Sequence, residues 1–177
     1  MDLYFIRHTS VDVAAGVCYG QFDVGLKDSF EQEAEAVCQQ IKDIRFDQVF
    51  TSPLSRCTRL AHFCGFHDAN QDSRLKEMDF GSWEMQVWDH IQDQQYLHAW
   101  YEDWTHLPAQ NGESLHDLYQ RVALFLDELK QNAYQKVGIF THGGVIACAS
   151  VYTEQVTFEK MFENKAAYGQ VIPITLV

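Results

Sequence analysis

The sequence predicts an α/β fold, a three-layer α/β/α sandwich with a mostly parallel central sheet and a small helical cap. Short apolar runs of four to six residues alternate with segments whose apolar residues recur every three to four positions. Strands that alternate with helices are typical of a parallel sheet covered on both faces. The 177 residues correspond to about one domain. We therefore expect residues 1–177 to form a single domain, with residues of about 77–120 inserted as the cap.

Each element has its own signal in the sequence. The apolar runs predict strands at residues 3–6, 48–51, 136–141 and near 170–177. The three-to-four spacing predicts helices from Ser29, after Ser52-Pro53, over residues 88–104, over residues 115–129 and from about Val145, with a short helical piece at 157–162. Pro53 favours a helix start, because proline is tolerated in the first turn.

The expected cap differs in composition from the remainder of the chain. The chain holds 13 Lys and Arg against 25 Asp and Glu, a net charge of −12. Nine of the acidic residues and all four tryptophans lie within 77–120, which has no Lys or Arg. This balance argues against binding to nucleic acid or to an anionic membrane. A few arginines in a pocket can still recruit a small anionic substrate.

The cysteines indicate a reducing compartment. The chain has five cysteines, an odd number, and no two of them form a C-x-x-C pair. Neither a disulfide framework nor a zinc finger is therefore expected. We expect reduced thiols and a cytoplasmic protein. No signal peptide or membrane-spanning stretch is recognised, and the oligomeric state is left open.

Polar residues follow three of the expected strands directly. Arg7-His8, Thr51-Ser52 and Thr141-His142 stand at strand ends, and Arg56 lies in the first turns of the next helix. In parallel sheets, ligands bind beyond the carboxyl ends of the strands. We therefore expect two guanidinium groups and two imidazoles to converge on a pocket suited to a phosphoryl group, since arginine pairs with phosphate oxygens and histidine can attack phosphorus.

Five segments carry a family resemblance. They are residues 3–9, 52–57, 75–84, 111–114 and 141–144, in that order along the chain. Together they resemble the signature segments of the histidine phosphatase superfamily, also called the phosphoglycerate mutase-like family. Residues 16–21, 77–85 and 100–113 are most similar to its alpha-ribazole phosphatases, which act in cobalamin nucleotide-loop synthesis. Thr9, Ser10, Ala14 and Phe30 depart from the superfamily pattern, which puts the lining on the phosphate side in doubt.

The resemblance implies a reaction and a set of residues for it. His8 is implied as the nucleophile toward a phosphomonoester, with Arg7, Arg56 and His142 holding the phosphoryl oxygens. Glu77 is implied as the proton donor to the leaving group. Gly143 and Ser114 are further candidates for oxygen contacts. No cofactor and no metal is expected, because no metal-ligand pattern is recognised.

The tryptophans have two readings. Trp83, Trp100 and Trp104 either stack on a flat aromatic leaving group or form the small core of the cap. For the whole chain, the alternatives to an alpha-ribazole-5′-phosphate phosphatase are a sugar- or glycerate-phosphate phosphatase or mutase of the same superfamily, and a non-catalytic phosphate-binding protein on this fold.

Overall fold

A computed structural model describes residues 1–163 and 165–177 of the chain. Its centre is a five-stranded sheet in the order β3-β2-β4-β1-β5. The strands are β1 (Asp2–Arg7), β2 (Gln48–Thr51), β3 (Asn70–Gln71), β4 (Lys136–Thr141) and β5 (Val171–Thr175). β5 runs antiparallel to β1, and the other neighbouring strands pair in parallel. The predicted, mostly parallel sheet is thus confirmed.

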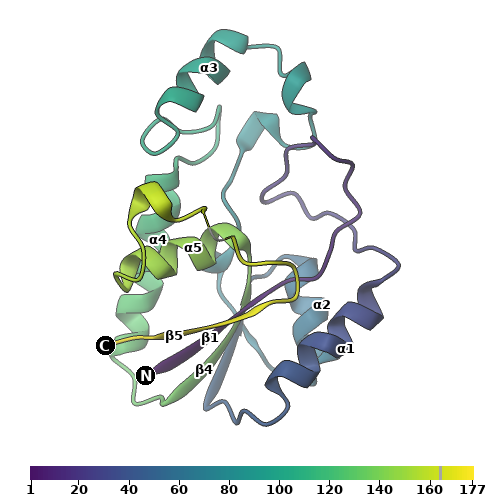
Figure 1. The fold of residues 1–177 in the computed structure, drawn as a ribbon, viewed down its shortest axis with the longest axis vertical. Coiled ribbons are helices and arrows are strands. Elements are labelled where there is room, and N and C mark those ends of the chain that lie inside the picture. Colours follow the sequence, from purple (N-terminus) through teal and green to yellow (C-terminus); the bar gives the residue numbers. More distant parts are fainter. Residues whose placement is uncertain (164) are drawn as a thin grey trace.

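Helices cover both faces of this sheet (Figure 1). α1 (Phe30–Ile41) and α2 (Ser55–Phe63) lie on one face, and α4 (Leu115–Lys130) and α5 (Gly143–Tyr152) lie on the other. Short 3₁₀ turns complete the chain: η1 (Ser73–Leu75), η2 (Gly81–Trp83), η3 (Trp88–His90) and η4 (Phe158–Lys160). The three-layer α/β/α sandwich expected from the alternation of strands and helices is present.

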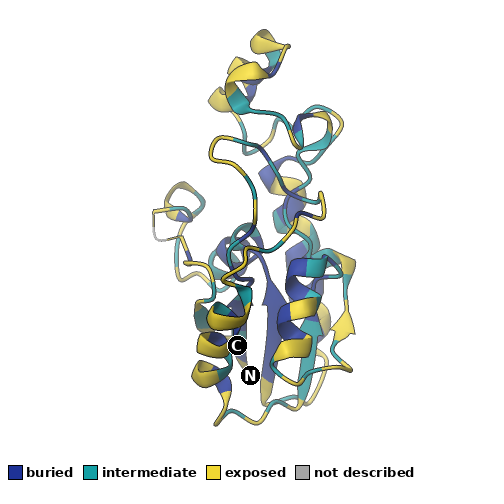
Figure 2. Cartoon of the chain, turned by 90° about the vertical axis from the view of Figure 1, so that its right-hand side faces the viewer, coloured by how far each residue is buried: buried dark blue, intermediate teal, exposed yellow. Residues whose placement is uncertain are grey.

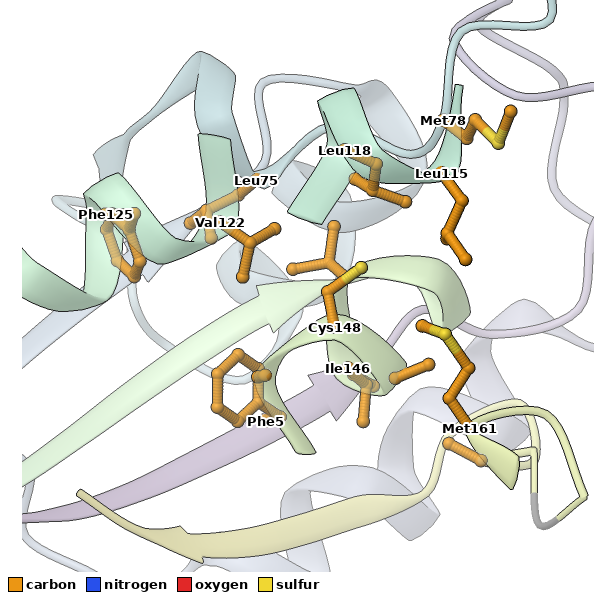
Figure 3. Close-up of a cluster of buried hydrophobic side chains, with 14 of the residues drawn as sticks. Phe5, Leu75, Met78, Leu115, Leu118, Val122, Phe125, Ile146, Cys148 and Met161 are labelled. Carbon is orange, nitrogen blue, oxygen red and sulfur yellow. The ribbon is translucent and has the colours of Figure 1, made fainter. Parts of the chain in front are cut away.

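The strands are buried because their side chains alternate between two cores. Leu3 and Phe5 of β1 pack with α4 and α5, whereas Ile6 packs with α1 and α2. Figure 3 shows Phe5 in the larger core, close to Ile146 of α5. Figure 2 shows the sheet as a buried layer between helices that are exposed on their outer sides. Burying such side chains contributes about 1.5–3 kcal/mol each, so both layers of helices are held firmly.

The tryptophan-rich segment, residues 77–114, extends beyond the sheet and carries α3 (Gln94–Glu102) at its far end (Figure 1). The helix predicted over 88–104 is shorter than expected and is preceded by η3. Asp93 accepts a hydrogen bond from the backbone N–H of Tyr96 and so starts the helix there. α4 begins at Leu115, so the last residues of the expected cap belong to a helix that packs on the sheet.

A disulfide corrects the prediction that all cysteines are reduced. Cys38 of α1 and Cys64, which follows α2, are bonded, with Cα atoms 5.3 Å apart. The two helices pack side by side on one face, and their contact brings together residues 26 positions apart. Cys18, Cys57 and Cys148 are free and buried. In the described part of the chain, no helix is long and apolar enough to cross a membrane.

Candidate active site

The sheet register brings the polar strand ends together. Arg7 at the end of β1 is paired with Thr141 at the end of β4. The next residue of each strand is a histidine, and the ring centroids of His8 and His142 lie 5.2 Å apart. Ser52, which follows β2, contacts His142 through a 2.8 Å hydrogen bond. Three strand ends therefore contribute to one site, as parallel pairing requires.

His8 is a buried, neutral imidazole with one free nitrogen. Its Nδ1 lies 2.7 Å from the backbone oxygen of Thr9. Because a carbonyl oxygen only accepts hydrogen bonds, Nδ1 carries the proton and Nε2 keeps its lone pair. Burial, with the positive charges of Arg56 and Arg7, lowers the pKa of His8 to about 3. The ring is thus uncharged and nucleophilic at Nε2 at neutral pH.

His142 lies behind this ring and is fixed at both nitrogens. Its Nδ1 accepts a hydrogen bond from Nε of Arg56 at 3.3 Å. The proton therefore resides on Nε2, which donates to Oγ of Ser52. Burial and then the charge of Arg56 hold the pKa of His142 well below its usual value. Because it is neutral, the His142 ring can accept the hydrogen bond from Arg56 and so hold the orientation of this fully buried side chain.

The two arginines are unneutralised cations. Arg56 donates from Nη1 to the backbone oxygen of Phe22 at 3.0 Å and from Nη2 to that of Gly20. Arg7 donates from Nη1 to the backbone oxygen of Ala166. Neither arginine forms an ion pair with a carboxylate among residues 1–163 and 165–177. Two such guanidinium groups beside a neutral imidazole suit a doubly charged phosphoryl group.

Glu77 is held at the edge of the site by backbone donors. Its carboxyl oxygens accept from the N–H of Gly144 at 3.1 Å and from the N–H of Met78 at 3.0 Å. Its carbonyl oxygen accepts from Arg121 at 2.8 Å, and Arg121 is paired with Glu113. A Cβ at Gly144 would lie 2.2 Å from Oε1 of Glu77. Only glycine at position 144 leaves room for the carboxylate there.

These residues open into one cavity of about 620 Å³. Arg7, His8, Arg56, Glu77 and Gly143 line its polar end, while His142 is fully buried behind them. Beyond the polar end the walls are mainly apolar. They include Met78, Phe80, Trp88, Leu115, Leu118, Ile146, Met161 and Phe162, with Lys160 and Lys165 among the further lining residues.

The cavity wall is formed by different aromatic residues from those expected. Trp83 and Trp100 are buried, with ring centroids 5.3 Å apart, and neither lines the cavity. Trp104 packs against Phe162 at 5.4 Å and lies outside the lining as well. Trp88, which the sequence reasoning did not select, lines the cavity and stacks on Trp100.

Ser114 caps a helix. Its side chain accepts from the N–H of Asp117 and donates to the carboxylate of Asp117. This capping box uses the hydroxyl fully, and Ser114 is absent from the cavity lining. The spacing of Ser114 and Asp117 before an apolar run is the sequence signal for that arrangement.

Four further residues of the site were missed at the sequence level. Ser52 and Tyr19 lie in segments that resemble the family, but neither was assigned a role in the site from the sequence. Tyr168 and Arg121 have no local pattern that marks them, because their partners are about 160 and 45 positions distant. Ala14, one of the departures from the family pattern, is exposed and outside the lining.

Comparison with known proteins identifies the family. The model of the histidine phosphatase superfamily (branch 1) matches residues 3–176. The chain belongs to this superfamily.

Individual relatives and structures agree with that assignment. The chain is 28% identical over 155 residues to the adenosylcobalamin/alpha-ribazole phosphatase of Escherichia coli K12, covering 83% of this chain and 76% of that protein. It is 25% identical over 150 residues to phosphoserine phosphatase 1 of Hydrogenobacter thermophilus, covering 80% and 71%. The crystal structure of the alpha-ribazole phosphatase from Shigella flexneri superimposes with a TM-score of 0.91 at 27% identity, covering 99% of this chain and 90% of that one.

Proposed function

We propose that this phosphatase hydrolyses phosphomonoesters through a covalent phosphohistidine on His8. The observation that carries this proposal is the unprotonated Nε2 of His8, which has no hydrogen-bond partner among the described residues and lies between two arginines without a carboxylate partner in the same part of the chain. A lone pair directed into an anion site is what attack on phosphorus requires. A non-catalytic phosphate-binding protein would have no need of it.

In the first step, Nε2 of His8 forms a bond to phosphorus while the bond to the ester oxygen breaks. Arg7 and Arg56 stabilise the charge that spreads over the equatorial oxygens. Gly143, whose backbone begins α5, contributes to the same end of the cavity. Glu77 donates its proton to the departing alkoxide, so the alcohol leaves neutral.

In the second step, water attacks the phosphohistidine. Glu77, now a carboxylate, takes a proton from that water, and the bond between Nε2 and phosphorus breaks. Inorganic phosphate leaves, and His8 returns to the state shown by its hydrogen bond to Thr9. His142 keeps Arg56 in place throughout, since Ser52 and Arg56 occupy both of its nitrogens.

We propose alpha-ribazole 5′-phosphate as the physiological substrate. The similarity to alpha-ribazole phosphatases supports this, as does the wall of Met78, Phe80 and Trp88 beside the polar end of the cavity. An aromatic base can pack on such a wall. The similarity to a phosphoserine phosphatase favours a smaller substrate as the alternative.

We also propose that the reaction needs no metal ion, because the arginines supply the positive charge. Within the described residues, no group of three or more His, Cys, Asp or Glu could hold a metal. The cytoplasm is proposed as the compartment on the three unpaired, buried thiols. The disulfide of Cys38 and Cys64 argues for an oxidising compartment instead, so thiol titration of protein isolated from the cell tests this part of the proposal.

The deciding experiment measures phosphate release from a panel of phosphomonoesters that includes alpha-ribazole 5′-phosphate, phosphoserine and 3-phosphoglycerate. The variant His8→Ala should lose at least a thousandfold in kcat/KM on every ester and form no acid-labile phosphoprotein. His98→Ala, an exposed histidine of α3, is the matched control and should behave as wild type. Full activity in excess chelator is expected. Unchanged turnover by His8→Ala would refute the mechanism, and a higher kcat/KM for phosphoserine would replace the proposed substrate.

A further inference from the structure

Two tyrosines from distant parts of the chain meet beside the polar end of the cavity. The hydroxyl of Tyr19 and that of Tyr168 are 2.7 Å apart, across 149 positions of sequence. Tyr168 places its ring 4.1 Å from the guanidinium of Arg7 and 5.4 Å from the ring of His8. Tyr19 lies 5.8 Å from the guanidinium of Arg56 and lines the cavity. Each tyrosine thus accompanies one arginine.

Backbone hydrogen bonds fix Tyr168 relative to the nucleophile. The N–H of Gly169 donates to the carbonyl of His8 at 3.1 Å, and the N–H of Arg7 donates to that of Gln170 at 3.0 Å. Gly169 adopts a φ of +67°, which favours glycine and lets the chain turn into β5. The ring of Tyr168 therefore stays beside His8 as long as β5 pairs with β1.

The segment that carries Tyr168 also leaves one edge of Arg7 free. The guanidinium donates from Nη1 to the backbone oxygen of Ala166, and its face is covered by Tyr168. Its Nε is buried and has no hydrogen-bond partner among the described residues. Nε and Nη2 form one of the two-donor edges with which arginine binds phosphate. The Nε–Nη2 edge of Arg7 can therefore donate two hydrogen bonds to a phosphoryl group.

Arg56 is supported in the same manner from the other loop. Its Nη1 and Nη2 donate to the carbonyls of Phe22 and Gly20, directly after Tyr19. Glu84 accepts from the backbone N–H groups of Gln21 and Phe22 and so holds this loop in place. The contact between the tyrosine hydroxyls joins this support to the one around Arg7.

We propose that Tyr168 is the positioning residue that presents the Nε–Nη2 edge of Arg7 to the phosphoryl group, and that its hydroxyl contact with Tyr19 couples the supports of both arginines. This inference rests on the proposed function only in naming a phosphoryl group as the ligand. Of the two hydroxyl protons, one is used within the contact. The other is available to a phosphoryl oxygen.

The test measures binding of inorganic phosphate by calorimetry, which needs no turnover, together with kcat and KM for p-nitrophenyl phosphate. Tyr168→Leu removes the ring and should raise the dissociation constant for phosphate about tenfold, the size expected for a lost contact between a cation and an aromatic face. In an Arg7→Gln background, the same substitution should change the dissociation constant for phosphate less than twofold, because Tyr168 acts through Arg7.

The hydroxyl contact is tested separately. Tyr168→Phe and Tyr19→Phe should each weaken phosphate binding about threefold, and the double variant should be no weaker than either single one. Tyr134→Phe serves as the matched control, since Tyr134 lies next to β4 at the opposite end of the strand, and its hydroxyl has no hydrogen bond among the described residues. It should match wild type.

Several results would overturn the inference. An unchanged dissociation constant in Tyr168→Leu, or an equal loss with and without Arg7, contradicts a positioning action through Arg7. Should Tyr168→Leu not fold, unchanged binding in both phenylalanine variants would do the same. If wild type binds phosphate and the variants behave as expected but no ester is hydrolysed, the proposed function fails while this inference stands.

Discussion

The carboxyl edge of the sheet and the tryptophan-rich segment are built on different principles. At the sheet edge, strand register places the polar side chains, and hydrogen bonds to backbone groups hold His8 and Glu77. The tryptophan-rich segment has little regular structure and is held by aromatic rings that pack on one another, with Trp83 at its centre. The polar end of the cavity therefore depends on strand register. The part of its apolar wall formed by Met78, Phe80 and Trp88 depends on side-chain packing.

The charges divide in the same way. Nine acidic residues and no basic ones lie within residues 77–120. Arg7 at the end of β1 and Arg56 in the first turn of α2 line the polar end of the cavity, and neither has a carboxylate partner in the described part of the chain. An acidic segment beside a basic pocket repels long polyanions but lets the pocket act on a compact ester. The contrast between the two regions leads to five predictions.

The largest effect is expected at the sheet edge, for Glu77→Gln. Loss of the proton donor should lower kcat about 10²–10⁴-fold for an alkyl phosphate. For p-nitrophenyl phosphate the loss should be smaller, because its leaving group departs without protonation. Steady-state kinetics on the two esters check this, with Glu102→Gln, exposed on α3, as the control. An equal loss on both esters would contradict the assignment of Glu77 as the acid.

The tryptophan-rich segment should separate stability from substrate binding. Trp83 is 1% exposed and touches Trp88, Tyr96 and Trp100, so Trp83→Ala should lower the free energy of unfolding by about 3–5 kcal/mol. Urea titration measures it.

Trp88 is compared with Trp83, because Trp88 belongs to the same segment but lines the cavity and is only partly buried. Trp88→Ala should raise KM for an aromatic nucleotide about two- to tenfold and leave KM for a small ester unchanged. Equal effects on both substrates would mean that the wall does not stack on the leaving group.

Two adjacent glycines sharpen the comparison further. A Cβ at Gly144 would lie 2.2 Å from Oε1 of Glu77, while one at Gly143 would meet Arg7 at an ordinary 3.4 Å. Gly144→Ala should displace the carboxylate and lower kcat about tenfold, an order-of-magnitude expectation for a shifted catalytic group. Gly143→Ala should retain most of the activity. The prediction is wrong if the two variants have the same kcat.

The last prediction concerns pH. The pKa of His8 is lowered to about 3, and that of His142 is also well below its usual value of 6.5. Below pH 6.5 the two histidines bind protons in the unfolded chain but stay neutral in the folded protein. The free energy of unfolding therefore decreases as the pH is lowered. The slope should be about 1 kcal/mol per pH unit for each histidine between pH 6 and 5. Urea titrations across this window test it, and His8→Asn should show a smaller slope.

Much of the sheet edge was predictable from the sequence, because apolar strands ending in Arg7-His8 and Thr141-His142 have one way to pair in a parallel sheet. The helices of the two layers were predictable as well, because their apolar residues recur every three to four positions. Contacts across distant loops were not predictable. Tyr168 and the pairing of Cys38 with Cys64 depend on which helices and loops pack together, and no local pattern records that.

The tryptophan-rich segment was the weaker part of the prediction. The sequence indicated aromatic residues, but not which of them would reach the cavity. Four tryptophans at irregular spacing can be buried in many arrangements, and the one adopted buries Trp83 and Trp100 and turns Trp88 to the cavity.

The burial of Arg56 without a carboxylate links folding to ligand. A fully desolvated cation held by two carbonyls and an imidazole leaves the empty protein less stable than the occupied one. An anion at a hundred times its dissociation constant adds about 2.7 kcal/mol, so phosphate, the product, should act as a folding aid as well as an inhibitor. On the proposed mechanism, a substitution at His8 removes the nucleophile and is expected to leave this stabilisation by phosphate in place.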